Sequence, residues 1–360
     1  MTVRVLSAMS GGVDSSVAAL LLSQAGHEVV GVMMKLFENE DIGEDITNAC
    51  CSLADRGDAE RAATVIDIPF YVYNYAEAFR RHVMDNFADE YAHGRTPNPC
   101  IECNRFLKFG ALLERADKLR CSHVATGHYA RIERVGERYL LYRGRDATKD
   151  QSYALYFLTQ AQLARIVFPL GNYTKSEVRD IASANGLENA AKPDSQDICF
   201  VPRGDFGDFL DEYTGAAAVH GDYIDTHGNV LGQHRGSRNY TIGQRRGLGI
   251  SSDTRLYVTA IDAQRNTVTL GTDADLYATR FTVNRVNLIA VDSLDGDTRC
   301  DVKIRYASPA KPATVRQTDN DTLEITFDSP QRAITPGQAA VLYDGDCVIG
   351  GGTIQLTINS

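Results

Sequence analysis

A short glycine turn near the start of the chain constrains the fold more than any other segment. An apolar run from Val3 to Met9 leads into the heptapeptide SGGVDSS, residues 10–16. A helix-forming segment follows and stops at Gly26, and the apolar stretch 27–37 then has the length of a second strand. Strand, turn, helix and strand within about 35 residues form a βαβ unit, which favours a parallel α/β sheet.

The same turn has the composition of an anion-binding site. Its two glycines allow backbone N–H groups to approach a negative charge, and the positive end of the following helix points at the same place. Three serines add hydroxyl donors. The turn lacks the lysine of the GxxxxGK[ST] phosphate loop, so it is not that loop. A plain helix cap by Asp14 or Ser15 is the alternative interpretation.

The alternation of predicted helices and strands continues to about residue 200, and the sequence pattern then changes. Beyond this point, short alternating segments are separated by Gly, Asp and Pro turns, which is typical of an all-β sandwich or barrel. We place the main domain boundary near residue 205 and a softer one near 280. In the first part, the patterns predict helices near 58–66, 76–92 and 106–119, and strands at 69–75 and from 123 to Gly127.

Composition narrows the class of protein. The chain has 360 residues, 43% of them hydrophobic, and a formal net charge of −10. It contains no apolar run of the ~20 residues that a membrane span requires and no signal-peptide pattern, so we expect a soluble, cytoplasmic protein without a membrane partner. The negative charge argues against broad nucleic-acid affinity, although binding follows local patches of charge.

Eight cysteines in a chain without an export signal favour metal, redox or catalytic use for those that cluster. Cys100 and Cys103 form a CxxC motif, which alone is ambiguous between half a zinc site, a redox dithiol and two buried thiols. The adjacent pair Cys50 and Cys51 is poorly spaced to complete a zinc site, and Cys199 stands alone. The remaining three lie in apolar or strand-like context and are predicted to be core residues: Cys121, Cys300 and Cys347.

The glycine turn and nine further motifs together resemble one protein family. SGGVDSS after a first strand is similar to the PP-loop of ATP pyrophosphatases, which cleave ATP to AMP and pyrophosphate. From residue 3 to about 355, the chain resembles the tRNA-specific 2-thiouridylase family. The motifs occur in the order AMSGGVDSSVAA, NACCSLADRGDAERAA, GRTPNPCIECNRFLKF, ATGHYARI, KDQSYAL, PLGNYTKSEVRDIA, KPDSQDICFVP, YTIGQRRGLGI, KIRYASPA and AITPGQAAVLYDGDCVIGGG.

This resemblance implies a three-part fold and a reaction. The fold is an α/β PP-loop domain with a Rossmann-like parallel sheet (1–205), a small β-rich central tRNA-binding domain (206–280) and a C-terminal β-barrel (281–360). The reaction is 2-thiolation of the wobble uridine of tRNA, in which ATP activates uracil O2 as an adenylate. The implied acceptors are tRNAs for Lys, Glu and Gln, and the implied sulfur donor is a cysteine desulfurase or a relay protein.

The resemblance also assigns roles to three cysteines. It makes Cys103 the nucleophile and Cys199 the carrier of a persulfide. Family members have Asp or Cys at the position of Cys100; the Asp form is given an acid–base role, which a thiol or water must assume here. As an alternative, these three cysteines hold an iron–sulfur cluster with one open iron that delivers sulfide.

Binding residues follow from the same motifs. ATP, with Mg²⁺ for which Asp14 is a candidate ligand, is assigned to Ala8, Met9, Ser10, Gly11, Gly12, Val13, Asp14, Ser15, Met34 and Gly127. Contacts to tRNA are assigned to Asn98, Pro99, Cys100, His128, Lys149, Asp150, Gln151, Arg305, Tyr306 and Gln338. A glycine-rich basic segment is a further candidate for binding RNA phosphates: His234, Arg235, Arg238, Tyr240, Arg245 and Arg246.

Two other functional classes fit the glycine turn. A PP-loop ligase for a small molecule would use the same ATP site without tRNA. A non-catalytic protein that binds tRNA or a sulfur carrier would bind its partner without releasing AMP. The all-β second part and the three cysteines disfavour the ligase, and the intact SGGVDSS disfavours the non-catalytic protein.

Overall fold

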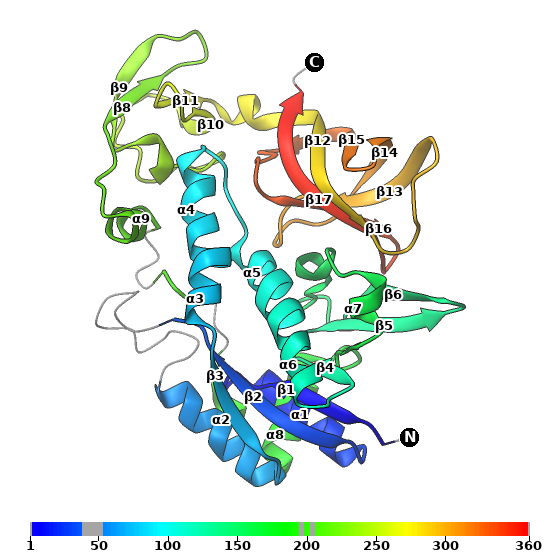
Figure 1. Cartoon of the computed structure of the whole chain (residues 1–360). Helices are drawn as coiled ribbons and strands as arrows, with labels where there is room; N and C mark the ends of the chain where they lie inside the picture. Colours follow the sequence, from blue (N-terminus) through cyan, green and yellow to red (C-terminus); the bar gives the residue numbers. More distant parts are fainter. Residues whose placement is uncertain (1, 38–52, 194–197, 202–205, 359–360) are drawn as a thin grey trace. The chain divides into compact units, whose positions relative to one another are not determined.

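The computed structural model of the chain describes residues 2–37, 53–193, 198–201 and 206–358 (Figure 1). The chain forms two compact units, each assembled from separate segments. The first unit consists of Met1–Val83, Cys100–Gly204 and Asp346–Val348, and the second of Met84–Pro99, Asp205–Gly345 and Ile349–Ser360. Within the described ranges, no helix has the length and apolar character needed to cross a membrane.

A five-stranded parallel sheet organises the first unit. Its strand order is β3-β2-β1-β4-β7, and every neighbouring pair is parallel. A buried parallel strand reads as a nearly unbroken apolar run, and β2 is accordingly buried from Val29 to Met34. The strands are β1 Arg4–Ala8, β2 Glu28–Lys35, β3 Phe70–Asn74, β4 His123–Ala125 and β7 Ile166–Val167.

Three helices share a hydrophobic core with this sheet: α1 Val13–Gln24, α2 Leu53–Ile66 and α8 Lys175–Ala184. Val17 of α1, Ala63 of α2 and Val178 of α8 belong to one buried cluster. The helix α1 ends just before Gly26, whose φ of +80° places it in the left-handed region, as expected of a glycine that terminates a helix. The predicted βαβ unit is therefore confirmed.

Two of the predicted helices are less regular than their sequences suggest. The helix predicted over 76–92 is α3 Ala76–Phe79, a π-helical segment η2 Arg80–Met84, and α4 Asp85–Ala92. The helix predicted over 106–119 begins earlier and comprises α5 Pro99–Glu102, the π-helical η3 Cys103–Ala111 and α6 Leu112–Lys118. The two π-helical segments meet where the rings of His82 and Phe106 stack, 4.4 Å between centroids. Such wide turns are frequent at functional sites.

Several shorter elements complete the first unit. The strand predicted to end at Gly127 ends two residues earlier, because β4 stops at Ala125. The chain then enters a hairpin of β5 Ala130–Val135 and β6 Arg138–Arg143, which the sequence patterns did not predict. The remaining short helices are η4 Ser152–Leu155, α7 Gln160–Leu163 and η5 Glu188–Ala191.

Aromatic packing joins α4 to the central part of the second unit. The ring of Phe87 lies 6.1 Å from that of Phe209 in α9 (Phe206–Thr214), and Tyr91 stacks on Phe206 at 4.6 Å. A four-stranded sheet of order β10-β11-β8-β9 follows. Its elements are β8 Gly221–Ile224, β9 Val230–His234, the 3₁₀ turn η6 Ser237–Asn239, β10 Tyr257–Asp262 and β11 Thr267–Gly271.

The C-terminal strands close into a barrel. Their order is β12-β15-β14-β13-β16-β17, and β12 pairs with both β15 and β17, so the predicted C-terminal barrel is confirmed. Inward residues such as Phe281, Val315 and Ile325 are fully buried. The elements are η7 Asp273–Leu276, β12 Tyr277–Leu288, β13 Asp297–Lys303, β14 Lys311–Asp319, β15 Thr322–Arg332, β16 Ala339–Asp344 and β17 Cys347–Ile358.

Closure of the barrel depends on a glycine in β17. A Cβ at Gly350 would lie 2.3 Å from the backbone oxygen of Asn287. We expect Gly350→Ala to destabilise the barrel by about 1–3 kcal/mol, the usual cost of overpacking. Hydrogen exchange of the β12 and β17 amides measures this, with Thr353→Ala in the same strand as the control. Equal protection in the two variants would contradict the prediction.

Candidate active site

The turn after β1 has a conformation that requires glycine at its second position. Gly11 has a φ of +79°, and a Cβ there would lie 2.2 Å from the backbone oxygen of Asp55. The N-cap of α1 is Gly12, with no side-chain cap. The alternative interpretation, in which Asp14 or Ser15 caps the helix, is therefore wrong.

Serine hydroxyls hold this turn in shape. Ser15 Oγ donates to the Gly12 carbonyl at 2.9 Å and accepts the Ser10 N–H at 3.1 Å. Ser16 Oγ donates to the same carbonyl at 3.2 Å. The hydroxyls of Ser15 and Ser16 thus support the backbone in this structure. The first N–H groups of a helix have no intrahelical acceptor, and they remain as donors for an anion.

A second loop meets the turn at the point where the strand order reverses. β1 and β4 are neighbours, and the chain proceeds from β1 towards β3 on one side and from β4 towards β7 on the other. Ligands of open α/β sheets bind at such a switch point, beyond the carboxyl ends of the strands. Gly127, just past β4, approaches the turn so closely that a Cβ would lie 2.8 Å from the carbonyl carbon of Asp14. Met34, near the end of β2, is 8% exposed.

The carboxylate of Asp14 is held by two side chains of the first unit. Lys175 Nζ lies 2.8 Å from each carboxylate oxygen, and the hydroxyl of Tyr129 donates to one of them at 2.7 Å. Lys175 therefore offsets a negative charge that would otherwise repel a bound phosphate. The sequence patterns alone did not predict a role for Lys175 or Tyr129.

The described residues do not form a cage for Mg²⁺. They contain no group of three or more His, Cys, Asp or Glu side chains arranged to hold a metal. Asp14, the expected ligand, is engaged with Lys175. Mg²⁺ commonly binds through substrate phosphates and waters with only one or two carboxylates, so these residues suit an ion that arrives with the nucleotide.

The three cysteines of interest all belong to the first unit. Cys100 in α5 is exposed, Cys103 at the start of η3 is 8% exposed, and Cys199 is half-buried. Cys100 and Cys103 stand three positions apart on the consecutive helical segments α5 and η3.

The other cysteines divide into two groups. Burial raises the pKa of the Cys300 thiol to about 12, and it also raises the pKa of Cys121. Both are therefore protonated at neutral pH, as suits the predicted core thiols; Cys347 is half-buried. Cys50 and Cys51 lie outside the described residues.

Several side chains expected to contact tRNA are engaged within the protein. The Asp150 carboxylate accepts from the N–H groups of Gly144 and Ser152, and Gln151 Oε1 accepts from the Tyr129 N–H. These two residues therefore shape the backbone around them. Lys149 is half-buried.

In the second unit, the expected tRNA residues differ in accessibility. Gln338 Nε2 donates to the carbonyls of Thr96 and Pro97, at 2.9 and 3.2 Å, and so supports the backbone just before Asn98 and Pro99. Arg305 donates to the Ala333 carbonyl and the Thr335 hydroxyl. Tyr306 is 47% exposed, Asn98 is half-buried and Pro99 is buried.

His128, an expected tRNA contact, is buried and neutral in this structure. It is 6% exposed, and its Nδ1 lies 2.6 Å from the Thr126 hydroxyl. The rings of Phe109 and Phe168 each lie 5.7 Å away. Burial, assisted by the charge of Lys108, holds the pKa of His128 well below its usual value.

Only some side chains of the basic segment after residue 233 are exposed on the surface. Arg235, Arg245 and Arg246 are exposed, whereas Arg238 pairs with Asp211 at 2.5 Å. Two members are core residues, contrary to expectation: His234 and Tyr240 pack with Tyr223 in an aromatic cluster. Aromatic rings within a glycine-rich segment can face inward, and sequence spacing does not reveal this.

A parallel sheet with a glycine turn at its switch point is typical of nucleotide-binding α/β proteins. Three family models match successive parts of the chain. They are described as the tRNA methyl transferase HUP domain (residues 3–203), the tRNA methyl transferase PRC-barrel domain (207–272) and the aminomethyltransferase beta-barrel domain (278–354).

Curated relatives cover nearly the whole chain. The tRNA-specific 2-thiouridylase MnmA of Natranaerobius thermophilus is 50% identical over 98% of each chain. That of Clostridioides difficile is 47% identical over 99% of each. A solved 4-thiouridine synthetase–RNA complex with bound ATP is 16% identical, with a TM-score of 0.37 over 59% of this chain and 50% of its own. The chain belongs to the tRNA-specific 2-thiouridylase family, and the resemblance seen in its motifs is confirmed.

The close approach of Gly127 to the turn predicts an effect on nucleotide binding. A Cβ in Gly127→Ala would displace the backbone at Asp14 and Ser15. We expect the Kd for ATP, measured by calorimetry, to rise about tenfold or more, since small shifts of anion-binding N–H groups weaken several contacts. Gly136→Ala, in the β5–β6 hairpin with no atom within 4 Å of the new Cβ, is the control. An unchanged Kd in Gly127→Ala would contradict the prediction.

The buried, neutral state of His128 predicts a pH dependence of stability. Below about pH 6.5, the unfolded chain binds a proton at this histidine while the native state does not. The free energy of unfolding therefore falls as the pH is lowered, by up to about 1.4 kcal/mol per pH unit from this residue. His128→Asn does not titrate, and we expect a shallower slope between pH 6.5 and 5 in hydrogen exchange of the first unit. Identical slopes in the variant and the parent would contradict this assignment.

Proposed function

We propose that the protein catalyses the ATP-dependent 2-thiolation of the wobble uridine of tRNA. The observation that carries this proposal is the glycine turn at the switch point, with Gly11 against Asp55 and Gly127 against Asp14. It occurs in a chain that is 47–50% identical, over nearly its full length, to proteins named tRNA-specific 2-thiouridylases. The protein is thus a tRNA sulfurtransferase that uses ATP.

In the first half of the reaction, uracil O2 attacks the α-phosphorus of ATP. The bond from this phosphorus to the bridging oxygen breaks, pyrophosphate leaves, and an O2-adenylate forms. Backbone N–H groups at the start of α1 hold the phosphates, and Lys175 keeps Asp14 from repelling them. Mg²⁺ bound with ATP would neutralise phosphate charge. The nucleotide contacts belong to Ala8, Met9, Ser10, Gly11, Gly12, Val13, Asp14, Ser15, Met34 and Gly127.

In the second half, sulfur replaces the activated oxygen at C2. Cys199 carries the sulfur as a persulfide, and its terminal sulfur attacks C2 while AMP leaves with its electron pair. The thiolate of Cys103 then attacks the Cys199 sulfur, which releases 2-thiouridine and forms a Cys103–Cys199 disulfide. A dithiol reductant must restore both thiols before the next turnover. Alternatively, Cys103 first frees hydrosulfide from the persulfide, and this attacks C2.

The cluster alternative has less support. It requires the thiolates of Cys100, Cys103 and Cys199 to converge on iron, and the part of the chain that the structure describes contains no metal-binding group of three such side chains. No step is therefore assigned to a cluster. The exposed Cys100 lies one turn of helix before Cys103 and stands where an acid–base group is placed in the Asp form of the family.

The substrate is a flipped-out base, because a wobble uridine must leave its stack to reach an enclosed pocket. We assign the base to Asn98, Pro99 and Cys100, and an exposed stacking contact to Tyr306. Exposed arginines at 235, 245 and 246 supply phosphate contacts. The acceptors are tRNAs for Lys, Glu and Gln, and a cysteine desulfurase or relay protein delivers the sulfur. Catalysis belongs to 1–205, and tRNA binding extends to 206–280 and the barrel at 281–360.

The reaction is tested by mass spectrometry of nucleosides from unmodified tRNA. With Mg-ATP, cysteine desulfurase and cysteine, we expect 2-thiouridine from the parent and from Cys347→Ala. We expect none from Cys103→Ser or Cys199→Ser, because each lacks one thiol of the relay.

The outcomes separate the alternatives. Thiolation with inorganic sulfide alone, over many turnovers and with iron bound, would favour the cluster over the persulfide. Release of AMP without tRNA, and no thiolated nucleoside under any sulfur supply, would favour a PP-loop ligase for a small molecule. Binding of tRNA without any AMP release would favour a non-catalytic protein.

A further inference from the structure

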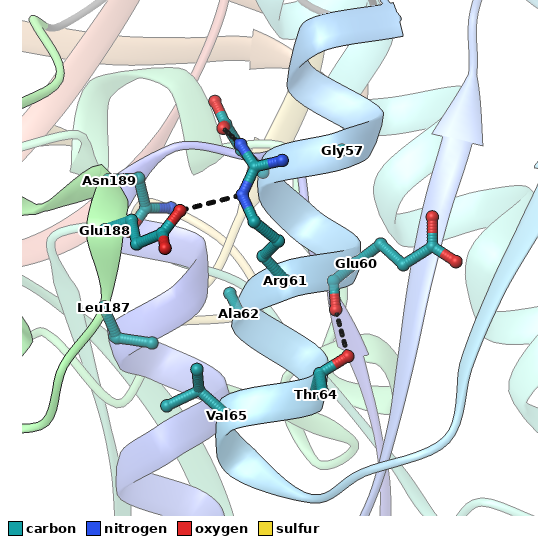
Figure 2. A pocket seen from close by; sticks show the side chains of 10 residues that line it. Gly57, Glu60, Arg61, Ala62, Thr64, Val65, Leu187, Glu188 and Asn189 are labelled. Atoms are coloured by element: carbon teal, nitrogen blue, oxygen red, sulfur yellow. Dashed lines mark hydrogen bonds and ion pairs between the residues drawn. The ribbon is translucent and has the colours of Figure 1, made fainter.

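Asn189, to which the reaction scheme assigns no role, lies directly against the phosphate turn. It belongs to η5 and is 7% exposed. Its Nδ2 donates to the Gly11 carbonyl at 3.1 Å and to Ser16 Oγ at 2.9 Å. Figure 2 shows Asn189 beside Leu187 and Glu188, facing helix α2, where they line a groove. Both of its hydrogen bonds are therefore directed at the turn that precedes α1.

The hydrogen bond from Asn189 to the Gly11 carbonyl orients the whole peptide group between Gly11 and Gly12. The peptide between Gly11 and Gly12 is planar and trans, so its N–H points opposite to its C=O. Since the Gly11 carbonyl points at Asn189, the N–H of Gly12 points away from Asn189. Both residues that flank this peptide are glycines with wide conformational freedom, so the hydrogen bond from Asn189 adds to the contacts that fix its orientation. Asn189 therefore sets the direction of a donor in the phosphate turn.

The segment that carries Asn189 is itself held on both sides. Arg179 of α8 donates to the carbonyls of Ala190 and Lys192, at 3.0 and 3.1 Å. Glu188 pairs with Arg61 of α2 at 3.0 Å, as the dashed line in Figure 2 marks. These contacts keep the Asn189 backbone in place, so its side chain is a fixed support for the turn.

The side-chain amide of Asn189 satisfies only its Nδ2, so its contribution comes from the two hydrogen bonds that this nitrogen donates. Its Oδ1 is buried and has no hydrogen-bond partner among the described residues. A buried acceptor without a partner costs free energy, so an apolar side chain would fill this space at lower cost. The two hydrogen bonds from Nδ2 are what such a side chain could not supply.

We infer that Asn189 is a positioning residue for ATP, which acts by orienting the Gly11–Gly12 peptide and the Ser16 hydroxyl of the phosphate turn. This inference rests on the proposed function for its ATP site only. It requires neither tRNA nor sulfur chemistry, so the two can fail separately.

The test is direct binding of a non-hydrolysable ATP analogue, with Mg²⁺, to the full-length protein. We expect Asn189→Leu, which keeps the volume and loses both donors, to raise the Kd about tenfold. Asn189→Asp places a carboxylate against two oxygen acceptors and near the phosphates, so its Kd should rise further, about a hundredfold. In thiolation assays, the KM for ATP should rise in both variants while the KM for tRNA stays constant.

Two comparisons distinguish positioning from a general structural role. Asn185→Leu is the matched control, because Asn185 accepts a hydrogen bond from Gln24 at the other end of α1. It should bind the analogue like the parent. In a double-mutant cycle, Ser16→Ala and Asn189→Leu should be non-additive, since each removes the same hydrogen bond.

Three results would overturn the inference: an unchanged Kd in Asn189→Leu, an equal rise in Asn185→Leu, or additive effects in the cycle. A parent protein that binds the analogue with these variant effects but never thiolates tRNA would leave the inference standing and overturn the proposed function.

Discussion

The absence of a Cβ at Gly11 is the constraint on which the nucleotide site depends. The backbone oxygen of Asp55 occupies the position 2.2 Å from where that atom would be, so the start of α2 packs directly on the phosphate turn. Gly127 makes a similar backbone approach from the β4 side. Contacts between backbones have little freedom to relax. Under the proposed function, these contacts would hold the N–H groups of the turn in position for the phosphates of ATP.

Charges around this turn are balanced within the first unit. Lys175 neutralises Asp14, and Lys192 Nζ lies 2.6 Å from an Asp55 oxygen and 2.5 Å from one of Asp58. Burial opposes the charge of Lys192, but the hydrogen bonds to the two carboxylates prevail and raise its pKa. Each lysine is therefore already paired with a carboxylate of the first unit. Under the proposed function, the phosphates of ATP would be held mainly by fixed backbone dipoles, and these depend less on pH than free side-chain charges do.

The sequence predicted those features whose signals are local. The apolar run, the glycine turn and the terminating Gly26 lie within one βαβ unit, and the alternating strands of the barrel carry their own pattern. The supports of the turn were missed, because Lys175 and Asn189 are 161 and 178 positions away from their partners, Asp14 and Gly11. Spacing does not encode such contacts. The π-helical turn at Cys103 was missed for another reason, because i→i+5 bonding has no recognised residue pattern. The earlier start of this helix was also missed, although Pro99 is the first residue of α5, a position that favours proline.

The two units are built from interleaved segments of the chain, and this limits how the gene can recombine during evolution. Residues 84–99 lie within the first family-model match, yet they belong to the second unit, where Phe87 and Tyr91 pack against α9. A protein that ended near residue 205 would lack α9, so the rings of Phe87 and Tyr91 would lose their packing partners and be exposed to water. Recombination at that junction would therefore separate the two sides of one aromatic cluster. The catalytic and β-rich parts are thus expected to be inherited together, as a single genetic unit, and not exchanged like independent modules.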